Sequence, residues 1–174
     1  MSESYKEKLK DITTFVFDVD GVLTNGEVIL EPAGDLIRTM STRDGYAIQY
    51  AVKKGYNICI ISGGNSQTVR TRMSYLGVQD VFLGSSNKEP VFDKYVSDKE
   101  LSVSEILYMG DDIPDYPVLK KVGIATCPHD AVPEVREVCH YISHLEGGKG
   151  CVRDVIEQVL KAKNDWFHTD AHHW

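Results

Sequence analysis

Short apolar runs that end abruptly in polar or acidic residues constrain the fold of this chain most. The runs lie at residues 13–17 (TTFVF), 57–61 (NICII), 106–109 (ILYM) and 122–125 (VGIA). Their apolar residues are continuous and do not alternate with polar ones, which is typical of strands covered on both faces. The sequence therefore predicts a central parallel sheet.

Amphipathic segments separate these predicted strands. Asp44 and Asn65 are expected to cap the first two helices, because Asp and Asn favour that position. Two further helices are predicted over residues 89–96 and 151–163, where apolar residues recur at helical spacing. Strands that alternate with helices predict right-handed crossovers, and so an α/β, Rossmann-like, three-layer sandwich.

One segment departs from this alternation. Residues 28–30 and 36–40 flank the turn sequence EPAGD, a pattern that predicts a β-hairpin. The hairpin directly follows the first acidic motif, so we expect a short flap beside the functional site and no cap domain. The length of 174 residues favours a single domain, with a core over about residues 12–164 and a C-terminal tail over 165–174. The tail (DWFHTDAHHW) is consistent either with a frayed end or with packing on a partner subunit.

Composition narrows the class of partner. The net charge of −7 argues against nucleic acid as a partner, which requires a basic face. No apolar run approaches the ~20 residues of a membrane span, and residues 1–10 do not resemble a signal peptide. Cys59, Cys127, Cys139 and Cys151 form no CxxC pair, so we expect reduced thiols in a cytoplasmic protein.

Acidic side chains follow two of the predicted strands, in segments 18–24 (DVDGVLT) and 110–115 (GDDIPD). Ligands of open α/β sheets bind beyond the carboxyl ends of the strands, so these carboxylates should gather there. Crowded carboxylates repel one another unless a cation neutralises them, and oxygen ligands favour Mg²⁺. Asp111 is the expected ligand from the second segment, while Asp112 and Asp115 are candidates to orient the ligands.

Four further roles follow from the chemistry of the side chains. Asp18 is the candidate nucleophile, which would form an aspartyl-phosphate. Asp20 lies two residues further on and can act as general acid and base. Ser62, after the second predicted strand, and Lys88, in a loop, can hold phosphate oxygens as charge develops in the transition state.

In this order, DVDGVLT, a serine at a strand end, an isolated lysine and GDDIPD resemble the four motifs of the haloacid dehalogenase (HAD) superfamily. The resemblance implies that Asp18 is the nucleophile and Asp20 the acid/base. It also implies that Mg²⁺ is bound by the Asp18 carboxylate, the backbone carbonyl of Asp20, and Asp111.

Further segments, 39–49 (TMSTRDGYAIQ), 87–88 and 147–154 (GGKGCVRD), resemble the capless subgroup that dephosphorylates 3-deoxy-D-manno-octulosonate 8-phosphate in lipopolysaccharide precursor biosynthesis. The resemblance covers residues 12–160. It implies a homotetramer in which hairpins and C-terminal segments of neighbours cover each active site. The positions that it assigns to substrate are Ser41, Thr42, Arg43, Asp44, Gly45, Arg72 and Lys88, and those at a neighbour's site are Lys149 or Arg153.

Several of these positions also have a purely structural interpretation. Asp44 with Arg43 could be a helix cap and a local ion pair, and Arg72 could lie along a helix surface. The glycine-rich segment 147–150 could be only a turn before the last helix. From the residues alone, neither interpretation is preferred.

Two positions depart from the octulosonate phosphatase pattern. Gly64 and Gln49 stand where that subgroup commonly has arginine, and each change removes a cation. One alternative is therefore a phosphatase for another sugar-acid phosphate, such as 3-deoxy-nonulosonate 9-phosphate. A second alternative is a non-catalytic oligomerising module related to the C-terminal domains of sugar-acid cytidylyltransferases. Retention of Asp18, Asp20 and the other motif residues argues against the module.

Overall fold

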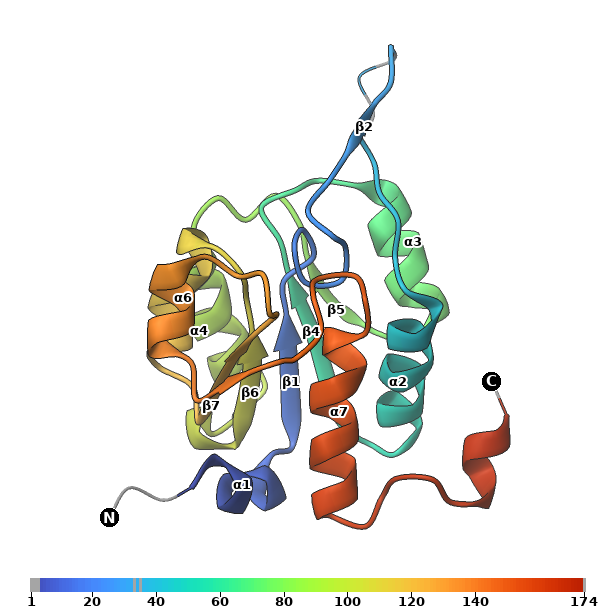
Figure 1. Cartoon of the computed structure of the whole chain (residues 1–174), viewed down its shortest axis with the longest axis vertical. Coiled ribbons are helices and arrows are strands. Elements are labelled where there is room, and N and C mark those ends of the chain that lie inside the picture. Colours follow the sequence, from blue (N-terminus) through green and yellow to red (C-terminus); the bar gives the residue numbers. More distant parts are fainter. Residues whose placement is uncertain (1–3, 33, 35, 174) are drawn as a thin grey trace.

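A computed structural model describes residues 4–32, 34 and 36–173 of the protein (Figure 1). A six-stranded sheet, paired parallel throughout, forms its centre in the order β5-β4-β1-β6-β7-β8. The strands are β1 (Thr14–Phe17), β4 (Asn57–Ile61), β5 (Asp80–Phe82), β6 (Ile106–Met109), β7 (Ile124–Cys127) and β8 (Tyr141–Ile142). The predicted parallel sheet is confirmed, and β4 and β6 have the predicted bounds.

Helices cover both faces of this sheet (Figure 1). On one face lie α2 (Thr42–Lys53), α3 (Gln67–Tyr75) and α7 (Cys151–Ala162), and on the other lie α4 (Lys88–Asp98), α5 (Tyr116–Leu119) and α6 (Pro133–Val138). The short elements are α1 (Tyr5–Lys8), η1 (Leu9–Asp11), η2 (Val103–Glu105), η3 (Ile113–Asp115) and η4 (Thr169–His172).

Two hydrophobic cores separate the three layers. Along β1, Phe15 and Phe17 enter the core shared with α2 and α7, while Val16 enters the core shared with α4 and α6. All three side chains are fully buried. Because successive side chains of a strand point to opposite faces, a strand between two cores must be apolar at every position. The predicted three-layer sandwich is confirmed.

The caps of the first two long helices differ from the prediction. Ser41 caps α2, since its hydroxyl accepts a hydrogen bond from Asp44 N at 3.3 Å, and Ser66 caps α3 through Val69 N. Asp44 lies within the first turn of α2, where its buried carboxylate accepts a bond from Arg153 N at 2.7 Å. Asp44 therefore satisfies the first turn of α7 and does not cap its own helix.

The predicted hairpin consists of β2 (Ile29–Leu30) and β3 (Leu36–Ile37), paired antiparallel. It projects from the end of the molecule where the carboxyl ends of the strands lie (Figure 1). Ile29 and Leu30 are 62% and 75% exposed. The described residues form the sheet and this hairpin, without a separate cap domain.

The described part of the C-terminal tail packs on α2 of the same chain. Lys54 Nζ lies 2.6 Å from an Asp170 carboxylate oxygen, and Tyr46 donates a hydrogen bond to Ala171 O. Trp166 meets the rings of Tyr46 and Tyr50 edge-on. No helix in the described part of the chain has the length and apolarity required to cross a membrane.

Candidate active site

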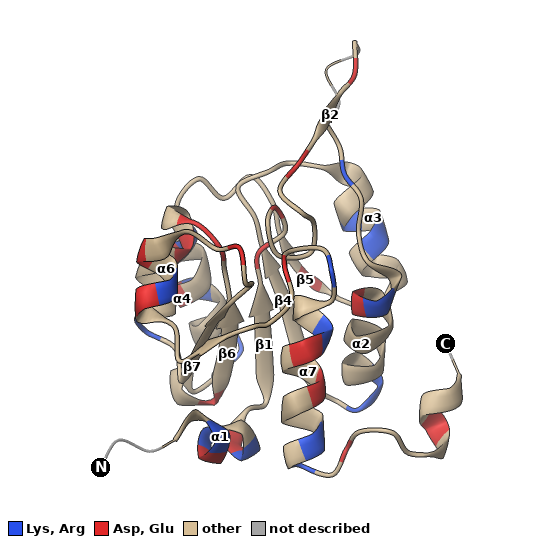
Figure 2. Cartoon of the chain, in the orientation of Figure 1, with Lys and Arg blue, Asp and Glu red and all other residues tan. Residues whose placement is uncertain are grey.

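A hollow of about 320 Å³ lies at the carboxyl ends of β1, β4 and β6. Every residue that sequence reasoning assigned to the reaction lines this hollow: Asp18, Asp20, Ser62, Lys88, Asp111, Asp112 and Asp115. Figure 2 shows acidic residues on the loops above these strands, Lys or Arg positions on α3, and positions of both charges on α2 and α7. The sheet thus brings together motifs that are nearly one hundred residues apart in sequence.

The pairing of β1 with β4 and β6, together with Gly21, positions the first acidic motif at the carboxyl ends of the strands. Phe17 pairs with both Ile60 and Met109, so the strands end level, and Asp18 N donates to Met109 O at 3.1 Å. Gly21 has a φ of +85°, which favours glycine. A Cβ on Gly21 would lie 1.9 Å from an Asp111 carboxylate oxygen, so only glycine lets the two motifs approach.

A second glycine pair supports the same turn from the C-terminal half of the chain. A Cβ on Gly147 would lie 2.0 Å from the carbonyl oxygen of Gly21. Gly148 N donates to Val22 O at 2.9 Å, and the thiol of Cys151, at the start of α7, also approaches Val22 O. The segment 147–150 is therefore a wall of the turn that carries Asp20, and not merely a flexible turn.

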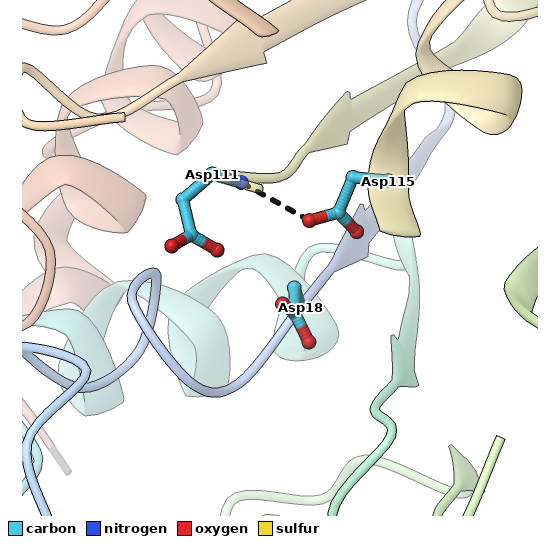
Figure 3. Close-up of side chains that lie close together, drawn as sticks. All are labelled: Asp18, Asp111 and Asp115. Carbon is cyan, nitrogen blue, oxygen red and sulfur yellow. Dashed lines mark hydrogen bonds between the residues drawn. The ribbon is translucent and has the colours of Figure 1, made fainter. Parts of the chain in front are cut away.

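Asp18, Asp111 and Asp115 place carboxylate oxygens within 4.8 Å of one another (Figure 3). Asp115 is fully buried and its oxygens are engaged. One accepts from Lys88 Nζ at 2.7 Å and Tyr108 OH at 2.5 Å, and the other accepts from the backbone N of Asp111 at 3.1 Å. Asp115 therefore orients the site, which leaves Asp18 and Asp111 as the candidate carboxylate ligands of an ion.

The charges of this cluster fit a bound cation. Burial, followed by the repulsion of Asp115, raises the pKa of Asp18 to about 7. Burial, followed by the charge of Asp18, raises the pKa of Asp111 to about 8. Asp111 Oδ1 is buried and lacks a hydrogen-bond partner among the described residues. A hard divalent cation between these oxygens would satisfy Oδ1 and remove the repulsion.

Lys88 links the nucleophile candidate to the orienting carboxylate. Its ammonium, only 4% exposed, lies 2.8 Å from Asp18 Oδ2 and 2.7 Å from Asp115 Oδ1. Burial alone would lower the pKa of Lys88, but Asp115 and Asp18 outweigh burial and raise it. The Ser62 hydroxyl, also buried, accepts a bond from Gly64 N at 3.2 Å. Both groups stand ready to donate to an anion in the hollow.

Asp20 lies nearer the mouth of the hollow, with its side chain 37% exposed. Its carboxylate is paired with the guanidinium of Arg38, from the segment after β3. Asp112 is exposed, and its carboxylate accepts a bond from Ile113 N at the start of η3, so it lies at the rim. Asp20 therefore combines access to solvent with a charged partner, Arg38.

The sugar-contact candidates on α2 and α3 lie outside the set of described residues that line this hollow. Asp44 is 1% exposed, and burial raises its pKa to about 6. The Arg72 guanidinium packs over Gly45, where a Cβ would lie 2.6 Å from Nη2, and near the ring of Tyr75. Ser41 and Thr42, at the start of α2, likewise do not line this hollow.

Arg43 lines a second hollow, of about 570 Å³, together with Lys149 and Arg153 of the loop and helix that follow β8. Arg153 Nε lies 3.2 Å from a Glu157 oxygen, and its guanidinium lies over the ring of Trp166. The structure therefore groups the candidates for a neighbour's site with Arg43, and apart from Asp18.

Two residues of the active site were not found from the sequence. The sequence predicts Tyr108 only as part of a buried strand. Its hydroxyl in an otherwise apolar run could have marked it, because the hydroxyl of a buried tyrosine usually has a hydrogen-bond partner. The sequence predicts Arg38 only as part of the hairpin. The one feature that could have pointed to it is its positive charge in the segment after the turn.

A parallel α/β sheet that presents an Asp-x-Asp turn, a serine, a lysine and an acidic pair at one edge defines a hydrolase of the HAD type. No protein-family model matches the sequence. The phosphatase KdsC of Salmonella typhi, named for 3-deoxy-D-manno-octulosonate 8-phosphate, is 33% identical over 156 residues, which are 90% of this chain and 83% of that protein. The chain belongs to the 3-deoxy-D-manno-octulosonate 8-phosphate phosphatase family.

Solved structures agree with this assignment. The Moraxella catarrhalis phosphatase of the same name, solved with magnesium, phosphate and a KDO molecule, is 30% identical, has a TM-score of 0.89 and matches over 92% of each chain. A Legionella pneumophila protein assigned to the HAD superfamily (subfamily III A) is also 30% identical with a TM-score of 0.89, over 91% of this chain and 87% of its own. The predicted family and fold are confirmed, and the two alternative functions are not favoured.

Proposed function

We propose that this protein is a Mg²⁺-dependent phosphatase that hydrolyses 3-deoxy-D-manno-octulosonate 8-phosphate to 3-deoxy-D-manno-octulosonate and phosphate. The observation that carries the proposal is the contact of Asp18 with Lys88 in a buried hollow that also holds the free carboxylate of Asp111. Support also comes from the relative that was solved with magnesium, phosphate and KDO.

In the first half of the reaction, a carboxylate oxygen of Asp18 attacks phosphorus and forms an aspartyl-phosphate. Lys88 and the Ser62 hydroxyl donate to the phosphate oxygens, where negative charge shifts in the transition state. The Asp18 carboxylate, the Asp20 carbonyl and Asp111 would hold Mg²⁺. When bound, the ion neutralises these acidic groups and the incoming phosphate.

Asp20 exchanges protons in both halves of the reaction. It protonates the sugar oxygen as the P–O bond to the leaving group breaks. It then accepts a proton from the water that attacks the aspartyl-phosphate, which returns Asp18 to its carboxylate form. Its exposed position at the mouth of the hollow is compatible with both the sugar oxygen and the water.

The sugar is bound by residues of more than one subunit in this proposal, and the active protein is a homotetramer. Arg43, Lys149 and Arg153 line a hollow of their own, so we assign them to the active site of a neighbour. The exposed apolar side chains of the hairpin, Ile29 and Leu30, offer a surface for assembly. Each chain forms a single domain, and the free thiols of all four cysteines are consistent with a cytoplasmic location.

A phosphate-release screen over sugar-acid phosphates with added Mg²⁺ tests the proposed function. We expect the octulosonate 8-phosphate to be turned over with the highest kcat/KM. A higher kcat/KM for the nine-carbon 3-deoxy-nonulosonate 9-phosphate would change the proposed substrate and leave the proposed reaction unchanged. Equal hydrolysis by the parent and the Asp18→Asn variant would overturn the enzyme assignment.

A further inference from the structure

Arg38 makes a two-point contact with the acid/base candidate. Its Nε lies 2.5 Å from Asp20 Oδ1, and its Nη2 lies 3.1 Å from Asp20 Oδ2. Its Nη1 donates to Leu36 O at 3.0 Å, so the guanidinium is held from the hairpin side as well. The Arg38 side chain is 8% exposed, although the hairpin that precedes it is exposed.

The room for this guanidinium comes from a glycine. A Cβ on Gly64 would lie 3.1 Å from Arg38 Nη2 and 3.2 Å from Asp20 Oδ2, which is tighter than ordinary contact. Arg38 thus stands beside the position where the related octulosonate phosphatases commonly have an arginine. The cation at this place is supplied by the hairpin and not by residue 64.

We propose that Arg38 is a positioning residue that fixes the Asp20 carboxylate for the step in which it acts as the base. The inference rests on the proposed function. A planar guanidinium that makes two hydrogen bonds restricts the carboxylate to one orientation. In that step, a water proton passes to Asp20 while the water oxygen bonds phosphorus. The bond between phosphorus and Asp18 breaks, and its electron pair stays on the Asp18 oxygen.

Two other roles for Arg38 predict different kinetics. If Arg38 bound the substrate anion, its loss would lower kcat/KM. If it only stabilised the fold, its loss would lower kcat and kcat/KM together, through a smaller active fraction. Loss of a positioned base instead slows the hydrolysis of the aspartyl-phosphate and spares the steps before it.

The test compares Arg38→Met with the parent on 4-nitrophenyl phosphate in Mg²⁺. The nitrophenolate leaving group requires no general acid, so its release in the first turnover reports formation of the aspartyl-phosphate, whereas its steady-state release also depends on hydrolysis of that intermediate. We expect kcat to fall about tenfold or more while kcat/KM stays within about twofold, because general base catalysis contributes 10²–10⁴-fold. A burst of nitrophenolate, stoichiometric with subunits, should precede the slow steady state.

Three companion variants sharpen the result. Arg38→Lys keeps the charge but loses the two-point contact, and should recover part of kcat. Arg70→Met is the matched control, since Arg70 donates to Val81 O and lies outside the hollow, and it should behave as the parent. In an Asp20→Asn background, Arg38→Met should have no further effect, because its role is exerted through Asp20.

Equal losses in kcat and kcat/KM, absence of the burst, or a further loss in the Asp20→Asn background would overturn the inference. So would a crystal structure of Arg38→Met in which the Asp20 carboxylate keeps its place, a measurement that does not depend on activity. Failure of the proposed function is distinguishable, since it would appear as a parent enzyme that releases no phosphate.

Discussion

The catalytic hollow and the second hollow, which Arg43 lines, differ in how far a single subunit completes them. In the catalytic hollow, Asp18, Lys88 and Asp115 are buried and joined by short contacts within the chain. In the second hollow, Arg43 comes from the start of α2 and Lys149 from the loop before α7, and both contribute charge to an open surface. This difference supports our proposal that one subunit supplies the groups that act on phosphorus, whereas residues of neighbouring subunits together bind the sugar.

The largest expected effect lies in the catalytic hollow. Asp18→Asn keeps the size of the side chain but removes the nucleophilic oxygen, so phosphate release should fall to the background rate. Sedimentation should show the parent's oligomer, because Asp18 lies away from the second hollow. If a sample of this variant that is free of contaminating phosphatase still releases phosphate, the reaction does not take place in this hollow as proposed.

Removal of the metal should have nearly as large an effect. Excess EDTA should silence the parent and added Mg²⁺ should restore phosphate release, since Asp18 and Asp111 repel the substrate phosphate when no cation neutralises them. A calcium-loaded sample is a useful comparison, because Ca²⁺ is equally charged but less strict in its geometry. Full activity in EDTA would show that Lys88 alone provides the needed charge.

A smaller and more selective effect is expected in the second hollow. Arg43→Gln should raise KM for the sugar-acid phosphate about tenfold, roughly the effect of one charged hydrogen bond, and leave 4-nitrophenyl phosphate unaffected. Lys94→Gln, on the exposed face of α4, is the control. An equal effect of Arg43→Gln on both substrates would show that Arg43 acts on the phosphate and not on the sugar. The proposed difference between the two hollows would then be wrong.

The smallest effect concerns stability without metal. The pKa of Asp18 is raised from 3.8 to about 7 and that of Asp111 to about 8, so the folded protein binds these protons more tightly than the unfolded chain. The free energy of unfolding of the metal-free protein should therefore fall as pH rises from about 4 to about 8. Thermal unfolding measures this.

Two additions sharpen that stability measurement. Mg²⁺ should raise Tm more at about pH 8 than at about pH 6, because it competes with protons for the same oxygens. Asp111→Asn should flatten the decline of Tm with pH in the absence of metal. An unchanged decline in this variant would assign the effect to another buried acid, such as Asp44.

The central strands could be predicted because a strand that is buried on both faces is apolar along its length, and such a run is visible in the sequence. A strand between two cores, such as β4 or β6, must be continuously apolar, and the loops that follow carry the chemistry. The edge strands β5 and β8 have three and two residues, too few for any periodicity to emerge, and they were not predicted. Strand β7 begins at Ile124, two residues later than the run predicted.

The parts of the site that could not be predicted depend on partners distant in sequence. Asp44 has the residue type of a cap, but its carboxylate bonds Arg153 N, 109 residues away. Arg38 is 18 residues from Asp20, and it meets Asp20 only because the hairpin returns to the hollow. Local propensity ranks Ser41 and Asp44 as equally good caps, so a single sequence cannot decide between them.

The close approach of Gly147 to Gly21 means that the active site cannot be complete when its reactive residues have been synthesised. The acidic groups, serine and lysine of the hollow have all been synthesised by residue 115, yet the wall behind the first turn arrives more than thirty residues later. A nascent chain that ends before Gly147 carries every reactive group and lacks the surface that shapes their backbone. The backbone contacts that shape the first turn can therefore form only once the segment before the last helix has been synthesised.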